Sequence, residues 1–170
     1  MTIKIIVLAT NEQADALIKE GSLAQMPSLQ DGWRFDFHKQ LKYLKDATAY
    51  VLVREDTPDV IEGCMIFQLL DKKKPYMAFL EVAPHNKGDE KKHDHVAGCL
   101  IAYAFKLSLM RGVGDYKGML YFEVGEERKE DEVKLMHLYS SRYRAMRLGT
   151  TNMMVIFDEN GELLIERYLN

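Results

Sequence analysis

The chain has 170 residues, 47% of them hydrophobic and 29% charged, so it can bury a substantial core and most simply forms one domain over residues 1–170. The formal net charge of −3 gives no support for wholesale nucleic-acid binding, and no apolar run approaches the roughly 20 residues of a membrane span. Nothing at the start resembles a signal peptide and two cysteines are too few for a disulfide framework, so we expect a cytoplasmic protein.

The first half of the chain is predicted to contain a strand, two helices and a hairpin. Residues 3–8 read as a short strand, whereas residues 13–20 (QADALIKE) place apolar side chains at helical spacing. A second amphipathic helix is predicted within residues 33–47. Residues 48–53 and 60–70 are rich in β-branched and aromatic side chains on either side of a polar turn, which predicts a hairpin.

The most informative pattern lies in the second half. A strand (Tyr76 to Val82), a charged loop, a helix that starts with Ala97 and Gly98, and a strand over residues 118–124 follow one another. The first turn of a helix has backbone N–H groups without partners and the positive end of the helix dipole, which suits a phosphate. The unit therefore indicates a nucleotide-like ligand.

The end of the chain is predicted to form a helix and a hairpin. Residues 126–143 begin with acidic side chains, which favour a helix start. Residues 152–157 and 163–169 then read as paired strands, with Asn160 and Gly161 in the tight turn between them.

Three blocks of sequence carry a family resemblance. LEVAPHNKG (80–88) ends a predicted strand, HVAGCLIAYAFKLSLMRG (95–112) forms the long apolar helix, and KLMHLYSSRYRAMRLG (134–149) contains a Leu-Tyr pair. In this order they resemble the central strand, the coenzyme-binding helix and the late helix of the GNAT superfamily of N-acetyltransferases. The resemblance covers nearly the whole chain. It implies an α/β (α+β) fold with a mixed, mostly antiparallel central sheet of about six or seven strands flanked by about four helices.

The resemblance also implies a coenzyme site for acetyl-CoA at the start of the long helix. The family's pyrophosphate signature is Arg or Gln, two residues, Gly, one residue, then Gly or Ala. This sequence offers Lys92, His95 and Ala97 at those positions, and only Ala97 matches outright. Gly98 directly follows and allows the register to shift by one.

Two residues are candidates for catalysis by the same resemblance. Tyr139 is expected near the coenzyme sulfur as the acid for the departing thiolate; the alternative is a ring that packs at a helix–sheet seam. Glu81 lies between Leu80 and Val82, whose backbone is expected to bind the thioester arm as an extra strand. Alternation turns Glu81 to the opposite face, where it could draw the proton of the amine; the alternative is an ion-paired or solvent-facing glutamate.

The loop before the long helix raises the question of a metal. His85, His93 and His95, together with Asp94, supply nitrogen and oxygen atoms that zinc accepts. Nothing in the sequence fixes the orientation of these side chains, so we expect no required metal.

We therefore expect an N-acetyltransferase that transfers an acetyl group from acetyl-CoA to a primary amine by direct attack. A small-molecule amine and a protein amine both fit as acceptor, no nucleic-acid or membrane partner is expected, and exposed terminal strands such as residues 163–168 leave a homodimer open. The alternative is a non-catalytic GNAT-fold binding module with a degenerate coenzyme site, a reading that His95 supports. A toxin that acetylates charged tRNA has no basic surface in its favour.

Overall fold

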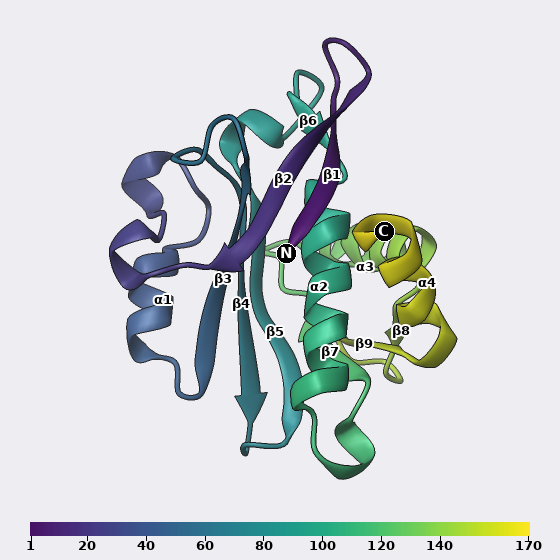
Figure 1. The fold of residues 1–170 in the computed structure, drawn as a ribbon. Coiled ribbons are helices and arrows are strands. Elements are labelled where there is room, and N and C mark those ends of the chain that lie inside the picture. The colour runs from purple at the N-terminus through teal and green to yellow at the C-terminus, as the bar shows by residue number, and fades with distance from the viewer.

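The computed structural model describes residues 1–170 and contains one nine-stranded sheet with four α-helices (Figure 1). The strands are β1 (Thr2–Val7), β2 (Glu12–Glu20), β3 (Ala47–Arg54), β4 (Ile61–Leu70), β5 (Lys74–Val82), β6 (His93–Asp94), β7 (Met119–Glu123), β8 (Met146–Arg147) and β9 (Met153–Phe157). The helices are α1 (Phe37–Tyr43), α2 (Val96–Arg111), α3 (Lys129–Tyr143) and α4 (Asp158–Leu169). None of the helices combines the length and the apolar character that crossing a bilayer requires.

The sheet has the strand order β6-β1-β2-β3-β4-β5-β7-β9-β8. Every neighbouring pair is antiparallel except β5 and β7, which are parallel and connected through α2. The mixed, mostly antiparallel sheet and the strand-loop-helix-strand unit are therefore confirmed. The expected count of six or seven strands is wrong, because the residues of β2 favour a helix and the two-residue edge strands β6 and β8 have no sequence signal.

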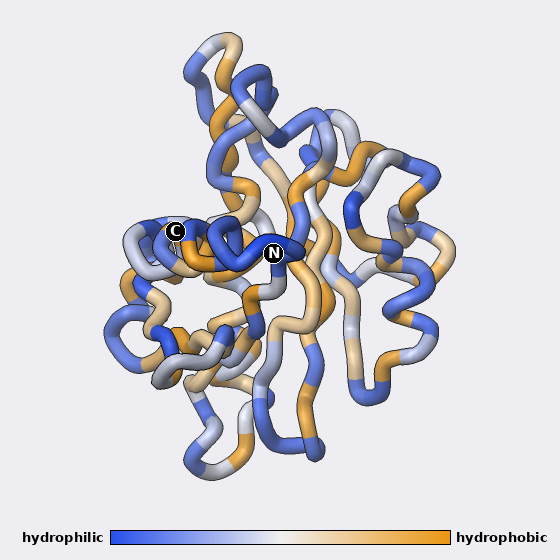
Figure 2. Tube along the Cα trace, turned by 180° about the vertical axis from the view of Figure 1, so that it is seen from behind, coloured by the Kyte–Doolittle hydropathy of each residue, from blue (hydrophilic) through white to orange (hydrophobic).

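Helices cover both faces of the sheet. In Figure 1, α1 lies on one side of the central strands, and α2 lies on the other side with α4 beside it. The larger core is on the α2 face and the smaller one, around Trp33 and Phe37, is on the α1 face. Figure 2 shows hydrophobic stretches along the strands and hydrophilic loops at the ends of the sheet.

The predicted helix over residues 13–20 is a strand. Ala14, Ala16 and Ile18 alternate toward the larger core, and β2 pairs with β1 on one edge and β3 on the other. The segment is rich in residues with high helix propensity, but pairing on both edges outweighs local propensity.

The predicted C-terminal hairpin is also wrong in its second half. β9 is a strand as expected, but residues 158–169 form α4, which packs along α2. Gly161 is part of this helix, and a Cβ at this position would lie 2.2 Å from ring atoms of Phe105. The glycine therefore permits close helix packing and does not form a turn. The residues expected as an exposed terminal strand, 163–168, are helical, so they cannot pair as edge strands between the subunits of a homodimer.

Candidate functional site

A cavity of ≈ 460 Å³ lies where β5 and β7 part. Tyr76 and Tyr121 form the single paired position between these strands. The cavity takes its lining from both strands, from α1 with the loop before it, and from α3; 11 of its 17 lining residues are hydrophobic. A mostly apolar hollow with a few polar groups is typical of a small-molecule site.

The edge of β5 beside this cavity has backbone groups without a strand partner. The Ala83 N–H donates to the Glu62 carbonyl at 2.9 Å, which makes these two residues a hydrogen-bonded pair of the β4–β5 ladder. Such pairs alternate along an antiparallel ladder, so Glu81 also bonds to β4, whereas Leu80 and Val82 direct their N–H and C=O groups away from it. An extended ligand chain can pair with such groups as an additional strand.

Tyr139 on α3 lies in the wall of the cavity. Its ring packs against Phe122 on β7, with ring centroids 4.9 Å apart. Burial raises the pKa of Tyr139 to about 12, with a further increase from the carboxylate of Glu126 and an opposing effect of Arg34. The phenol is therefore protonated at neutral pH and can donate to an atom in the cavity.

Glu81 is not part of the cavity wall. Its buried carboxylate accepts hydrogen bonds from the backbone N–H groups of Arg34 (2.7 Å) and Phe35 (3.0 Å) and forms an ion pair with Lys87. The carboxylate thus fixes the loop before α1 against β5. The structure does not bring Glu81 and Tyr139 together at the cavity.

Two charged residues that sequence reasoning missed meet at the cavity. The Arg34 guanidinium forms a bidentate ion pair with the Glu126 carboxylate, with Nη1 2.7 Å from Oε1 and Nη2 2.9 Å from Oε2. Glu123 also lines the cavity, and its carboxylate accepts a hydrogen bond from Asn152 at 3.0 Å. The ion pair connects the loop before α1 to the segment after β7, so it joins the two sides of the cavity. No local pattern marks these residues, because they come from distant parts of the chain.

The start of α2 lies near the end of β5. Val96 packs against Gly63, which is the β4 partner of Val82. His95 is the residue before the helix and has a left-handed backbone with φ of +73°, a conformation that favours glycine. The pyrophosphate signature has a glycine at the position of His95, and the left-handed backbone gives a physical reason for that glycine.

The four predicted coenzyme-binding residues at this helix start are in different environments. The His95 ring packs against the Tyr168 ring of α4, with ring centroids 5.3 Å apart. Burial lowers the pKa of His95, so the imidazole is neutral at pH 7. Ala97 is half-buried, and Gly98 is buried beneath the Tyr168 ring, where an added Cβ would approach that ring to 2.4 Å. Lys92 is exposed and makes no ion pair. Its neighbour Lys91 pairs with Asp94 and is therefore the lysine near the helix start.

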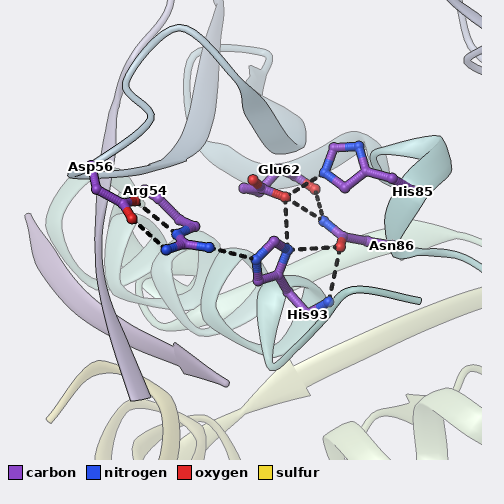
Figure 3. Close-up of polar contacts among 6 residues, drawn as sticks. All are labelled: Arg54, Asp56, Glu62, His85, Asn86 and His93. Atoms are coloured by element: carbon purple, nitrogen blue, oxygen red, sulfur yellow. Dashed lines mark hydrogen bonds and ion pairs between the residues drawn. The ribbon is translucent and has the colours of Figure 1, made fainter. Parts of the chain in front are cut away.

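The histidines considered as metal ligands separate into two environments. His95 is at the start of α2, whereas His85 and His93 meet at the buried carboxylate of Glu62 (Figure 3). One oxygen of Glu62 is 2.5 Å from His85 Nε2 and 3.0 Å from His93 Nδ1, and it accepts a hydrogen bond from Asn86 Nδ2 at 2.7 Å.

The protons of this cluster can be assigned from its neighbours. Arg54 Nη1 lies 3.2 Å from His93 Nε2, and a guanidinium can only donate, so Nε2 accepts and Nδ1 carries the proton toward Glu62 (Figure 3). A metal on Nδ1 would require that proton to move to Nε2, where it would face the Arg54 donor. The arrangement therefore fits a hydrogen-bonded network that anchors the loop before α2 better than it fits a metal centre.

No protein-family model matches the chain, and no curated protein matches its sequence. Solved structures do share its fold. A KacTA–DNA complex is similar at 12% identity with a TM-score of 0.55, over 89% of this chain and 99% of the matched chain. AtaTR bound with AcCoA is similar at 18% identity with a TM-score of 0.54, over 88% and 98%. A Klebsiella pneumoniae protein described as an acyl-CoA N-acyltransferase is similar at 15% identity with a TM-score of 0.52, over 82% and 95%. These likenesses confirm the expected GNAT fold.

The expectation that nucleic acid is excluded as a partner is wrong. The same fold is present in a complex with DNA, so a net charge of −3 is no ground for the exclusion. The charge is also unevenly distributed, since three arginines and only one carboxylate line one hollow at the junction of α3 and α4: Arg144, Arg167, Glu166 and Arg142, which pairs with Asp94. A net charge averages over such a local basic surface.

Proposed function

We propose that this protein is an N-acetyltransferase that transfers an acetyl group from acetyl-CoA to a primary amine by direct attack. The observation that carries the proposal is the unpaired edge of β5 beside the cavity, with the Tyr139 phenol in the cavity wall. The thioester arm would pair with Leu80 and Val82, and the diphosphate would lie at the start of α2, which follows the end of β5. The likeness in fold to AtaTR bound with AcCoA supports the same coenzyme.

The proposed reaction has one bond formed and one broken. The amine nitrogen attacks the thioester carbonyl, and the tetrahedral intermediate collapses with cleavage of the carbon–sulfur bond. The Tyr139 hydroxyl donates to the departing sulfur, and a carboxylate receives the proton that the amine loses. Glu126 is held by Arg34, so we assign the proton to Glu123, the other carboxylate of the cavity. Glu81, occupied by backbone N–H groups, is assigned a positioning role.

Calorimetric titration with acetyl-CoA followed by a thiol-release assay tests the proposal. We expect saturable binding, and free thiol should appear only when an amine is present. The amine panel should contain small amines, a peptide with a free N-terminus and an aminoacylated RNA, because charge alone does not exclude a nucleic-acid partner. No binding at about 1 mM acetyl-CoA, which corresponds to only about −4 kcal/mol, would contradict the proposal.

A second candidate function is a non-catalytic binding module of the same fold. The observation in its favour is the closed start of α2, where the Tyr168 ring covers Gly98 and the backbone at His95 is held in a conformation suited to glycine. Coenzyme binding without thiol release for every amine in the panel would favour this candidate.

A further inference from the structure

The start of α2 already holds an anion that belongs to the chain itself. One carboxylate oxygen of Asp94 accepts a hydrogen bond from the His95 N–H at 2.8 Å. The same oxygen lies 3.2 Å from Lys91 Nζ and 3.1 Å from Arg142 Nη2. A backbone N–H, an ammonium and a guanidinium are the donors that a phosphate oxygen takes in proteins.

The electrostatic balance at Asp94 favours the ionised carboxylate. Its side chain is 29% exposed, and this partial burial acts to raise its pKa. The His95 N–H, Lys91 and Arg142 outweigh that effect and hold the pKa of Asp94 below its ordinary value. The position is therefore built to stabilise negative charge, and a carboxylate of the loop supplies that charge.

A buried hydroxyl at the same place lacks a partner. Tyr168 is 3% exposed, its ring covers Gly98, and its hydroxyl makes no hydrogen bond of ordinary length and angle, although it lies close enough to Arg142 to contribute to raising the pKa of that guanidinium. Leaving such a group unbonded costs about 1–3 kcal/mol. A ligand oxygen at the start of α2 would give this hydroxyl an acceptor once the groups around it move apart.

We propose that Asp94 is an internal competitor for the diphosphate of the coenzyme. In the free protein it occupies the anion position at the start of α2, and acetyl-CoA binds by displacing it from Lys91 and Arg142, which then pair with the diphosphate. The inference rests on the proposed function, because it concerns the same coenzyme site. In this way Asp94 lowers the affinity of the chain for its own coenzyme.

The test compares Asp94→Asn with the wild-type chain by calorimetric titration. Asparagine keeps the shape and can still accept from the His95 N–H, but it has no charge to hold the two cations. We expect acetyl-CoA to bind about tenfold more tightly to the variant, since about 1.4 kcal/mol of competing interaction is removed. Asp89→Asn is the matched control: Asp89 is exposed and forms no ion pair, so the same change in net charge there should leave the affinity unchanged.

A second ligand identifies the part of the coenzyme that competes. S-acetylpantetheine carries the thioester arm without the diphosphate, so its affinity should be the same for the wild-type chain and for Asp94→Asn. Equal acetyl-CoA affinity in these two proteins would overturn the inference and leave the proposed function standing. An equal gain for both ligands would also overturn it. Absence of binding to either protein would overturn the proposed function and the inference together.

Discussion

Replacing Glu81 with glutamine separates two roles for a buried carboxylate, holding a loop and accepting a proton. In the wild-type chain one oxygen accepts from the Arg34 N–H at 2.7 Å and pairs with Lys87, and the other accepts from the Phe35 N–H at 3.0 Å. Glutamine retains one acceptor oxygen and places an NH₂ group at the other position, where it faces a backbone donor. A hydrogen bond to a charged group contributes about 1.5–3 kcal/mol, and the partly exposed lysine pair adds less than about 1 kcal/mol.

We therefore expect Glu81→Gln to lower the free energy of unfolding by about 2–3 kcal/mol, equivalent to a fall in Tm of about 4–12 °C for a chain of this size. Thermal unfolding followed by circular dichroism measures the stability, and thiol release measures kcat and KM. Because the loop before α1 lines the cavity, KM for the amine should rise more than kcat falls.

The control is Glu55→Gln, which removes the same charge from an exposed position and should leave Tm unchanged. The positioning role would be refuted if Glu81→Gln kept the wild-type Tm while kcat fell by about 100-fold or more, as loss of a general base predicts.

Tyr139→Phe should lower kcat by about 100-fold and leave the affinity for acetyl-CoA within about twofold, because the phenol acts on the departing sulfur; equal kcat for the two proteins would remove Tyr139 from the mechanism. Gly161→Ala should lower the free energy of unfolding by about 1–3 kcal/mol, because the new Cβ collides with an aromatic ring of α2, whereas Gly125→Ala, with open space around it, should have no such effect in the same urea titration. Burial lowers the pKa of His93 and His95 from 6.5, so below that pH the unfolded chain binds protons that the folded chain does not, and stability should fall as the pH drops from 7 to 5. His93→Gln should reduce that slope, and an unchanged slope would show that His93 does not contribute to it.

The sequence predicted the parts of the fold whose signals are local. The unit from β5 through α2 to β7 was predictable because apolar runs, a charged loop and small residues at a helix start each act over a few positions. β2 was not, because its residues favour a helix and only pairing with β1 and β3 makes it a strand. α4 was not, because Asn160 and Gly161 have the chemistry of a turn, and the reason for the glycine lies on a neighbouring helix.

The candidate site also contains one residue with a local sequence signal and others without one. The Leu-Tyr pair was a sequence signal, and Tyr139 does lie in the wall of the cavity. The ion pair of Arg34 with Glu126 joins residues 92 positions apart, and that of Arg142 with Asp94 joins residues 48 positions apart. Contacts of this kind depend on how the helices and loops pack against one another, so a local sequence pattern cannot predict them.

A crystal structure of the protein with acetyl-CoA would show where the coenzyme binds. We expect the thioester arm to pair with the backbone of Leu80 and Val82, the sulfur to lie beside the Tyr139 hydroxyl, and the diphosphate to replace Asp94 between Lys91 and Arg142. A coenzyme bound elsewhere on the protein, with the unpaired edge of β5 still open, would contradict the proposed coenzyme site.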